Sequence, residues 1–323
     1  MKAPLLDVQE LTRDYVSHTV FSSPHRHRAL DSVSIRMEPA SIFGLVGESG
    51  SGKSTLARIV AALDRPTSGK VMFDGDDLFA LPARQLMRRR SAFQMVFQDP
   101  FGSLDPRQRI GRTVAEPLHA LPAHLGRRQI EDRVAEVLES VGLSVDHTRR
   151  YPHEFSGGQR QRIAIARALV TEPKLVIADE PVSALDLSVQ AQILNLIMDL
   201  RERRGVAFLF ISHNLAAVDC IADTVGVMYG GRIVETGPAD EVFRTPLHPY
   251  SQALAAAEPS VQVQHRQKPQ VRLPRRVPAG ENDCAFRSRC PLAIERCATE
   301  RPELRPVSAG RSVACHRPSL DRT

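Results

Sequence analysis

The 323-residue sequence contains no apolar run that approaches 18 residues. The lack of such a run excludes a transmembrane helix. Residues 1–7 also lack the apolar core of a secretory signal, so we expect the chain to stay in the cytosol. Cysteines are normally reduced in that compartment, and a cluster of them therefore indicates a metal site rather than disulfides.

The composition is that of an ordinary globular protein, with 42% hydrophobic and 25% charged residues. The length leaves room for one large domain or two smaller ones. The net charge of +6 indicates an acidic partner, which could be a nucleotide, a nucleic acid or an anionic membrane surface. Part of the arginine excess lies in runs such as residues 88–90, where a solvated surface explains it equally well.

A glycine-rich loop with the sequence GESGSGKST occupies residues 47–55. It matches the phosphate-binding pattern G-x-x-x-x-G-K-[ST], and it lies between an apolar run and a helical pattern, as that pattern requires. The glycines let backbone N–H groups turn toward anionic oxygens, and the following helix presents the positive end of its dipole. Lys53 is predicted to reach the β- and γ-phosphates, and Ser54 to bind Mg²⁺. The predicted nucleotide-binding residues of this loop are Gly47, Glu48, Ser49, Gly50, Ser51, Gly52, Lys53, Ser54 and Thr55.

Two further segments have residues suited to binding or hydrolysing a nucleotide. Residues 174–180 form an apolar strand that ends in two carboxylates. Asp179 can hold Mg²⁺ through water, and Glu180 is placed to orient or deprotonate an attacking water. Upstream, Ser156 follows Phe155 and precedes two glycines and a helical pattern, so it can cap a helix whose N-terminal amides form a second anion site.

The remaining patterns predict an α/β core that is interrupted by a helical insert. Residues 5–46 read as β-rich with a surface loop between 16 and 28, and residues 100–168 become helical. The apolar runs 175–178 and 207–211 flank a helical pattern over 187–202, which predicts a βαβ unit with a parallel sheet. Residues 259–280, rich in Pro, Gln and Arg, read as a linker.

With these motifs the chain resembles the ATPase subunits of ABC transporters over about residues 5–257. The matches are the phosphate loop, a Gln-loop at 96–100, the signature at 156–159, the acid strand at 174–180, and the segments 183–186 and 211–214, in that order. The resemblance implies an α/β fold: a P-loop ABC-type ATPase core with an antiparallel β subdomain, a helical subdomain insert and a small C-terminal cysteine-containing extension. The implied bounds are 1–98 and 169–257 for the core, 99–168 for the helical subdomain, and 258–323 for the linker and extension.

The resemblance also implies catalytic and binding roles within one subunit. Tyr15 would stack on adenine, and Gln98 would sense Mg²⁺ and the water. His213 would hold the γ-phosphate and support Glu180.

Other roles would be played across a dimer of two such subunits. Ser156 and Gly158 of the signature, with Gly157 and Gln159, would contact the ATP bound by the facing subunit, and Asp186 would couple the two sites. ATP would thus close the dimer, and hydrolysis would reopen it.

Residues 97–106 and 245–251 resemble the oligopeptide/dipeptide importer branch of this family. This implies ATP-driven uptake of peptides at the cytoplasmic face of the inner membrane. The implied partners are a second, related ATPase in a heterodimer, two permease subunits and an extracytoplasmic solute-binding protein. Import of nickel or another small solute remains an alternative. An ABC-type ATPase that acts on nucleic acid or ribosomes is disfavoured, because those proteins generally carry long coiled-coil insertions or two fused cassettes.

The final segment carries four of the five cysteines, Cys284, Cys290, Cys297 and Cys315. Their spacing fits neither common zinc pairs nor the common ferredoxin run, so chemistry alone indicates one soft-metal site. The resemblance favours a [4Fe–4S] cluster of structural role, with Zn²⁺ or four unligated surface cysteines as alternatives. Replacing Cys290 by serine would then loosen the tail and leave ATP binding intact. The fifth cysteine, Cys220, is expected to be a core residue.

Overall fold

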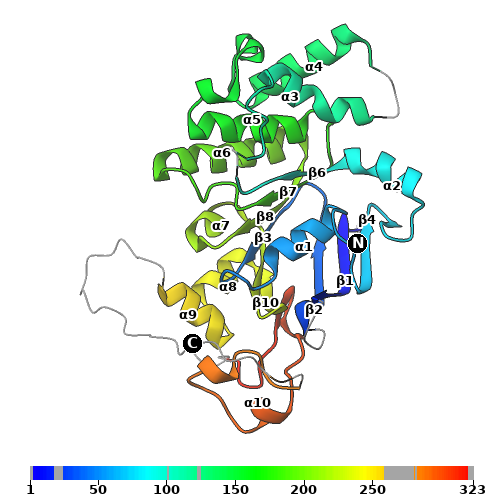
Figure 1. Cartoon of the computed structure of the whole chain (residues 1–323). Helices are drawn as coiled ribbons and strands as arrows, with labels where there is room; N and C mark the ends of the chain where they lie inside the picture. The colour runs from blue at the N-terminus through cyan, green and yellow to red at the C-terminus, as the bar shows by residue number, and fades with distance from the viewer. Residues whose placement is uncertain are drawn as a thin grey trace.

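The computed structural model describes residues 3–17, 25–99, 102–121, 125–257, 280 and 282–318. In Figure 1 a central sheet separates a group of helices at one end of the molecule from the C-terminal segment, with α10, at the other. Among the helices that the structure describes, none combines the length and the apolar composition that spanning a bilayer requires.

The strands are β1 (Leu6–Ser17), β2 (His25–Met37), β3 (Ile42–Val46), β4 (Ser68–Phe73), β5 (Asp76–Asp77), β6 (Phe93–Val96), β7 (Leu175–Asp179), β8 (Ala207–Ser212), β9 (Thr224–Tyr229), β10 (Arg232–Pro238), β11 (Arg305–Ser308) and β12 (Arg311–Val313). The helices are α1 (Lys53–Val60), α2 (Ala83–Arg89), α3 (Ile110–Ala115), α4 (Arg127–Ser140), α5 (Gly157–Leu169), α6 (Leu187–Arg204), α7 (Leu215–Ile221), α8 (Ala239–Arg244), α9 (Pro249–Ala257) and α10 (Arg296–Thr299).

The larger sheet has the strand order β11-β12-β10-β9-β3-β8-β7-β6. Its centre is parallel, because β3 pairs in parallel with β8 and β9, and β7 pairs in parallel with β6 and β8. Strand β8 is buried throughout. Phe208 and Phe210 pack into the core on one face, and Leu209 and Ile211 into the core on the other. The apolar run of β8 is continuous because both faces of the strand are buried, as the sequence predicts for a parallel sheet. The predicted βαβ unit β7–α6–β8 is confirmed.

A smaller antiparallel sheet has the strand order β2-β1-β4-β5. It covers the side of α1 that faces away from the larger sheet (Figure 1). Its apolar residues, among them Leu6, Val33 and Phe73, share one core with Leu56 and Ile59 of α1. This core holds the helix that follows the phosphate loop. Strand β1 ends at Ser17 and β2 begins at His25, so both ends of the loop predicted between 16 and 28 belong to strands, and residues 18–24 lie outside the described residues.

The helical insert lies between β6 and β7 and contains α3, α4 and α5. One face of α4 is apolar, since Val134, Val137 and Leu138 are buried and the partly buried Ile130 packs against the same core. These residues share the core that extends beneath the sheet to Phe208. The insert is thus packed onto the sheet through a continuous apolar interface.

The C-terminal segment, residues 282–318, is joined to the sheet of the core. Strand β12 pairs antiparallel with β10, in the register Glu235 to Val313, and β11 pairs with β12. We refer to residues 282–318 as the extension. The predicted linker at 259–280 lies outside the described residues except for Gly280.

Cys220 corrects an expectation, because it is exposed rather than in the core. Helix α7 buries Ala217, Val218 and Ile221, which lie three and four residues apart on one face. Cys220 falls between those positions and points to the other side of the helix.

Candidate active site

The phosphate loop runs from the end of β3 to the start of α1. Two of its glycines are required by close backbone contacts and by a left-handed backbone. A Cβ on Gly47 would lie 2.2 Å from the Met228 carbonyl oxygen, and one on Gly52 would lie 2.5 Å from the Ala29 carbonyl oxygen, with φ of 109° at Gly52. Any other residue would have to move strand backbone, so the glycines let the loop lie directly on the sheet.

Lys53, the first residue of α1, bends back over this loop. Its Nζ donates to the carbonyl oxygens of Gly47 at 2.7 Å and Glu48 at 3.0 Å. Burial lowers the pKa of Lys53, while the nearby carboxylates of Glu180 and Asp179 act to raise it. The ammonium group is therefore held within the loop, where phosphate oxygens would bind.

Ser54 and Asp179 supply an oxygen pair beside the loop. The Ser54 hydroxyl donates to Asp179 Oδ1 at 3.3 Å. Burial raises the pKa of Asp179, and the adjacent Glu180 charge raises it further, so a cation here would relieve the cost of two close carboxylates. A hydroxyl and a carboxylate are ligands that Mg²⁺ accepts, and these two residues fit that ion. When bound, it neutralises charge on the phosphates.

Glu180 and His213 form the pair most directly suited to catalysis. His213 Nδ1 lies 2.8 Å from Glu180 Oε2, and the Glu180 side chain is only 9% exposed. The Glu180 backbone has a φ of 52°, an unusual value for a side-chain-bearing residue, and its N–H donates to Ile211 at the end of β8. The end of β7 thus holds the backbone of Glu180 in a strained conformation. Backbone strain of this kind is concentrated at functional sites.

These groups surround one cavity of about 590 Å³. Its lining joins the phosphate loop to Gln98 at the end of β6, to Glu180 and to His213. Leu254 of α9 also lines it, a residue that the sequence analysis did not single out. The structure therefore brings together the phosphate loop, which begins at Gly47, and His213, which lies 166 positions after that glycine, at the carboxyl ends of the parallel strands.

The signature residues lie outside this cavity, at the start of α5. The Ser156 hydroxyl accepts from the Gln159 N–H at 3.3 Å, and Gln159 Oε1 accepts from the Ser156 N–H at 3.0 Å. This capping box leaves Gly157 and Gly158 in the partly exposed first turn of the helix. The predicted helix cap is confirmed, and contact of this turn with a second nucleotide stays a prediction.

Asp186 is likewise outside the cavity. It is exposed and begins α6 without a side-chain cap, and the next residue, Leu187, is 81% exposed. An apolar side chain this exposed, beside the residue assigned to intersubunit coupling, is consistent with a surface that a partner covers.

Tyr15 does not line the cavity in this structure. Its hydroxyl donates to Asp64 at 2.8 Å, and the Arg13 guanidinium lies over its ring at 4.5 Å from the centroid. One face of the ring is therefore already occupied, and adenine stacking by Tyr15 stays a prediction.

The four cysteines of the extension gather around one narrow cavity, together with His248 and His316. Burial raises the pKa of Cys284, Cys290 and Cys315, and the neighbouring thiols raise it further. Four converging thiols suit a soft metal or an iron–sulfur cluster. Within the described residues, however, no group of three or more His, Cys, Asp or Glu side chains is arranged to hold a metal ion.

Comparison with known proteins shows to which family the chain belongs. A family model described as ABC transporter matches residues 30–183, and one described as the C-terminal region of oligopeptide/dipeptide transporters matches residues 234–297. The "Di/tripeptide transport ATP-binding protein DppF" of Pseudomonas aeruginosa (strain UCBPP-PA14) is 47% identical over 97% of this chain and 97% of its own. The chain belongs to the ATP-binding proteins of ABC transporters.

Other relatives agree with this family. The "Dipeptide transport ATP-binding protein DppF" of Escherichia coli (strain K12) is 43% identical, covering 98% of this chain and 95% of its own. A solved dimer of the ATP-binding cassette MJ0796, in a post-hydrolysis state with ADP and Pi, superposes with a TM-score of 0.64 at 26% identity, over 72% of this chain and 98% of its own. The cbiO1 structure from Clostridium perfringens gives 0.65 at 28% identity, over 75% and 92%. The expected P-loop ABC fold is confirmed, and this ABC protein is an ATPase.

Proposed function

We propose that this ATPase is the motor subunit of a membrane importer of di- and oligopeptides. The observation that carries the proposal is the extent of the likeness to peptide transport ATP-binding proteins, which includes the extension as well as the cassette. Import of nickel or another small solute would use the same motor, because the solute meets the permease and the binding protein rather than this subunit.

The proposed reaction is attack of water on the γ-phosphorus of ATP, which breaks its bond to the β–γ bridging oxygen and releases ADP and phosphate. Lys53 and the loop amides would hold the phosphates, and Ser54 and Asp179 would hold the Mg²⁺ that neutralises them. Glu180 accepts the proton of the attacking water, and His213, with its Nδ1 protonated, donates to Glu180 and fixes its orientation. Gln98, at the edge of the same cavity, reports the state of the nucleotide to the helical insert.

The proposed coupling of this reaction to transport uses two subunits. ATP on the phosphate loop of one subunit is also contacted by Ser156 and Gly158 of the other, so that ATP closes the pair and hydrolysis reopens it. Only a difference in ATP affinity between the open and closed states can drive such a change. The exposed Asp186 and Leu187 support this surface as the contact.

The proposed assembly is a heterodimer with a related ATPase, bound at the cytoplasmic face of the inner membrane to two permease subunits, with a solute-binding protein outside. Purification of the tagged chain from detergent-solubilised native membranes, followed by mass spectrometry, tests this assembly. Recovery of two permeases and a second ATPase supports it. Recovery of ribosomes or DNA without any membrane protein contradicts it.

Uptake identifies the solute. Cells that express the wild-type chain should accumulate a labelled dipeptide, and cells that express Glu180→Gln should not. Accumulation of ⁶³Ni²⁺ in place of the peptide, with the same dependence on Glu180, would replace the peptide assignment by the small-solute alternative.

We further propose that the four cysteines of the extension hold a structural [4Fe–4S] cluster. Their convergence on one cavity supports a soft-metal site, and zinc is the alternative. Assay of iron, acid-labile sulfide and zinc in anaerobically purified protein decides between these groups. Absence of all three elements contradicts any metal site.

A further inference from the structure

The extension contacts the ATP site directly, through Arg289. This residue ends a short 3₁₀ turn, Arg287–Arg289, and immediately precedes Cys290. Its two terminal nitrogens lie 2.8 Å from the two carboxylate oxygens of Glu48 in the phosphate loop. The Arg289 side chain is only 9% exposed and the Glu48 side chain is 39% exposed, so the guanidinium is largely shielded from water while the carboxylate remains partly open to it. It joins residues 241 positions apart.

The backbone of Glu48 is fixed by a second contact from the same side. Its N–H donates to the Tyr250 hydroxyl at 2.8 Å, and Tyr250 is fully buried. Tyr250 packs against Tyr229 and against Phe286, which lies three residues before Arg289. The side chain and the backbone of Glu48 are therefore both held by a cluster to which the extension contributes.

Glu48 is in turn part of the structure that receives phosphate. Its carbonyl oxygen, with that of Gly47, accepts from Lys53 Nζ. A shift of Glu48 would move the amides on either side of it and the lysine together. Holding these groups in place before ATP arrives removes an ordering cost from binding.

The charge of Glu48 gives a second reason why its ion pair with Arg289 should affect ATP binding. Glu48 lines the cavity where the phosphates of ATP would bind, and a bare carboxylate there would repel them. The guanidinium of Arg289 compensates that carboxylate at hydrogen-bond distance. Removing the arginine leaves the negative charge and frees it to turn toward the phosphates.

We propose that Arg289 is a positioning residue of the ATP site, through which the cysteine-bearing extension raises the affinity of the phosphate loop for nucleotide. The inference rests on the ATP-binding function and goes beyond it, because it makes the extension part of that site. By linkage, nucleotide on the loop stabilises the docked extension to the same degree. The proposed role of Arg289 is opposite to the sequence-based expectation that loosening the tail at Cys290 leaves ATP binding intact.

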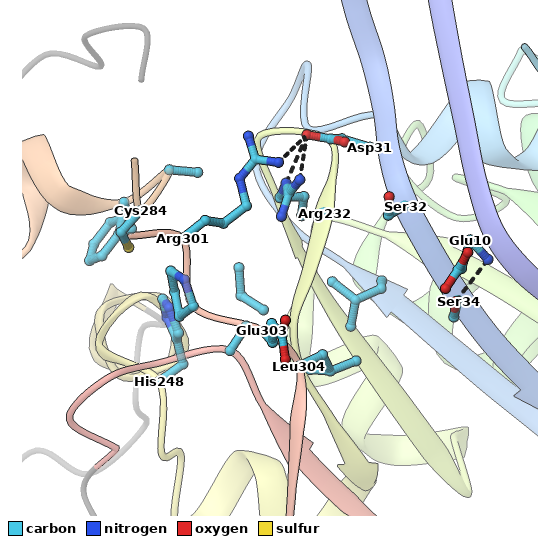
Figure 2. Close-up of a pocket in the computed structure, with 16 residues that line it drawn as sticks. Glu10, Asp31, Ser32, Ser34, Arg232, His248, Cys284, Arg301, Glu303 and Leu304 are labelled. Carbon is cyan, nitrogen blue, oxygen red and sulfur yellow. Dashed lines mark hydrogen bonds and ion pairs between the residues drawn. The ribbon is translucent and has the colours of Figure 1, made fainter. Parts of the chain in front are cut away.

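A second ion pair between the extension and the core offers a matched control. Arg301 lies 3.3 Å from Asp31 of β2, which also receives Arg232, and Figure 2 shows both guanidinium groups meeting that carboxylate at the edge of a cavity. That cavity contains no residue of the phosphate loop. Arg301→Gln therefore removes an extension–core ion pair without touching the ATP site.

The test is a calorimetric titration of the full-length protein with MgATP. We expect Arg289→Gln to weaken ATP binding by at least about fivefold, the lower range of measured coupling between sites. Arg301→Gln should stay within about twofold of the wild type. In the double variant Glu48→Gln/Arg289→Gln, affinity should recover relative to Arg289→Gln alone, because no bare carboxylate remains.

The outcomes separate the proposals. Wild-type affinity in Arg289→Gln, or an equal loss in Arg301→Gln, would each overturn the role of the Arg289–Glu48 pair while leaving the ATPase intact. No recovery in the double variant would overturn the charge argument and leave positioning as the whole effect. A wild-type protein that does not bind ATP would overturn the proposed function together with this inference.

Hydrogen exchange gives a second readout that does not depend on affinity alone. At saturating ATP, amides of residues 284–297 should exchange more slowly than without ATP in the wild type, and this difference should shrink in Arg289→Gln. Equal ATP protection in both proteins would contradict coupling through this pair.

Discussion

A buried ion pair, Arg311–Glu235, should control the docking of the extension on the sheet. Glu235 on β10 is 0% exposed and Arg311 on β12 is 6% exposed, and they meet at 2.7 Å. Glu235 also accepts from the N–H groups of Leu247 and His248 at 3.0 and 2.9 Å. In Arg311→Met the chain keeps similar bulk, but the carboxylate stays buried without its cation.

Removing one partner of a buried pair costs about 3–5 kcal/mol. We expect the lower end, about 3 kcal/mol, because the two backbone N–H groups still satisfy the carboxylate of Glu235. Since each 1.4 kcal/mol is a factor of ten, the opening equilibrium of the extension should rise by roughly a hundredfold. Hydrogen exchange of residues 305–313 measures this local opening.

Arg296→Met is the matched control, because Arg296 pairs with Glu300 on the surface, with both side chains at least half exposed. Such a solvent-exposed pair adds little to stability, because water screens it. If Arg311→Met changes the opening free energy by no more than Arg296→Met, the buried pair does not hold the extension and the reasoning is wrong.

Further predictions address the nucleotide, the signature helix and the cysteines. Lys53→Ala should lower ATP affinity at least about tenfold, because an ammonium on the phosphates is lost; titration that shows unchanged affinity would contradict its role. Gly158→Ala should destabilise the fold by about 1–3 kcal/mol in urea unfolding, because the added Cβ would lie 2.4 Å from Val189, whereas Gly157→Ala, with its nearest contact at 3.5 Å, should be close to neutral. Cys297→Ser should reduce the bound metal measured by elemental analysis, and an unchanged content would exclude Cys297 as a ligand.

Local and near-local patterns allowed much of the ATP site to be predicted. The phosphate loop, the acid strand and the signature each depend on neighbouring residues, and the ends of parallel strands must meet at one edge of a sheet. The approach of His213 to Glu180 follows from the pairing of β7 with β8, which their apolar runs indicated.

Contacts that depend on docking were not predicted. Nothing near Arg289 in the sequence indicates Glu48, and β12 carries too few residues to specify β10 as its partner. The same limit explains Cys220, where a single apolar residue in a short helix does not determine the buried face. Tyr15 was assigned by resemblance alone, and its local partners, Arg13 and Asp64, could not be foreseen.

The most direct test of the account is to measure ATP binding and ATP turnover together in Glu180→Gln, within the assembled transporter. The account predicts that MgATP still binds, because Lys53 and the loop are unchanged, while hydrolysis falls about 10²–10⁴-fold with the loss of a general base. Glu202→Gln, at an exposed position of α6, should hydrolyse ATP like the wild type. Hydrolysis at the wild-type rate in Glu180→Gln would contradict the assignment of Glu180 and the mechanism built on it.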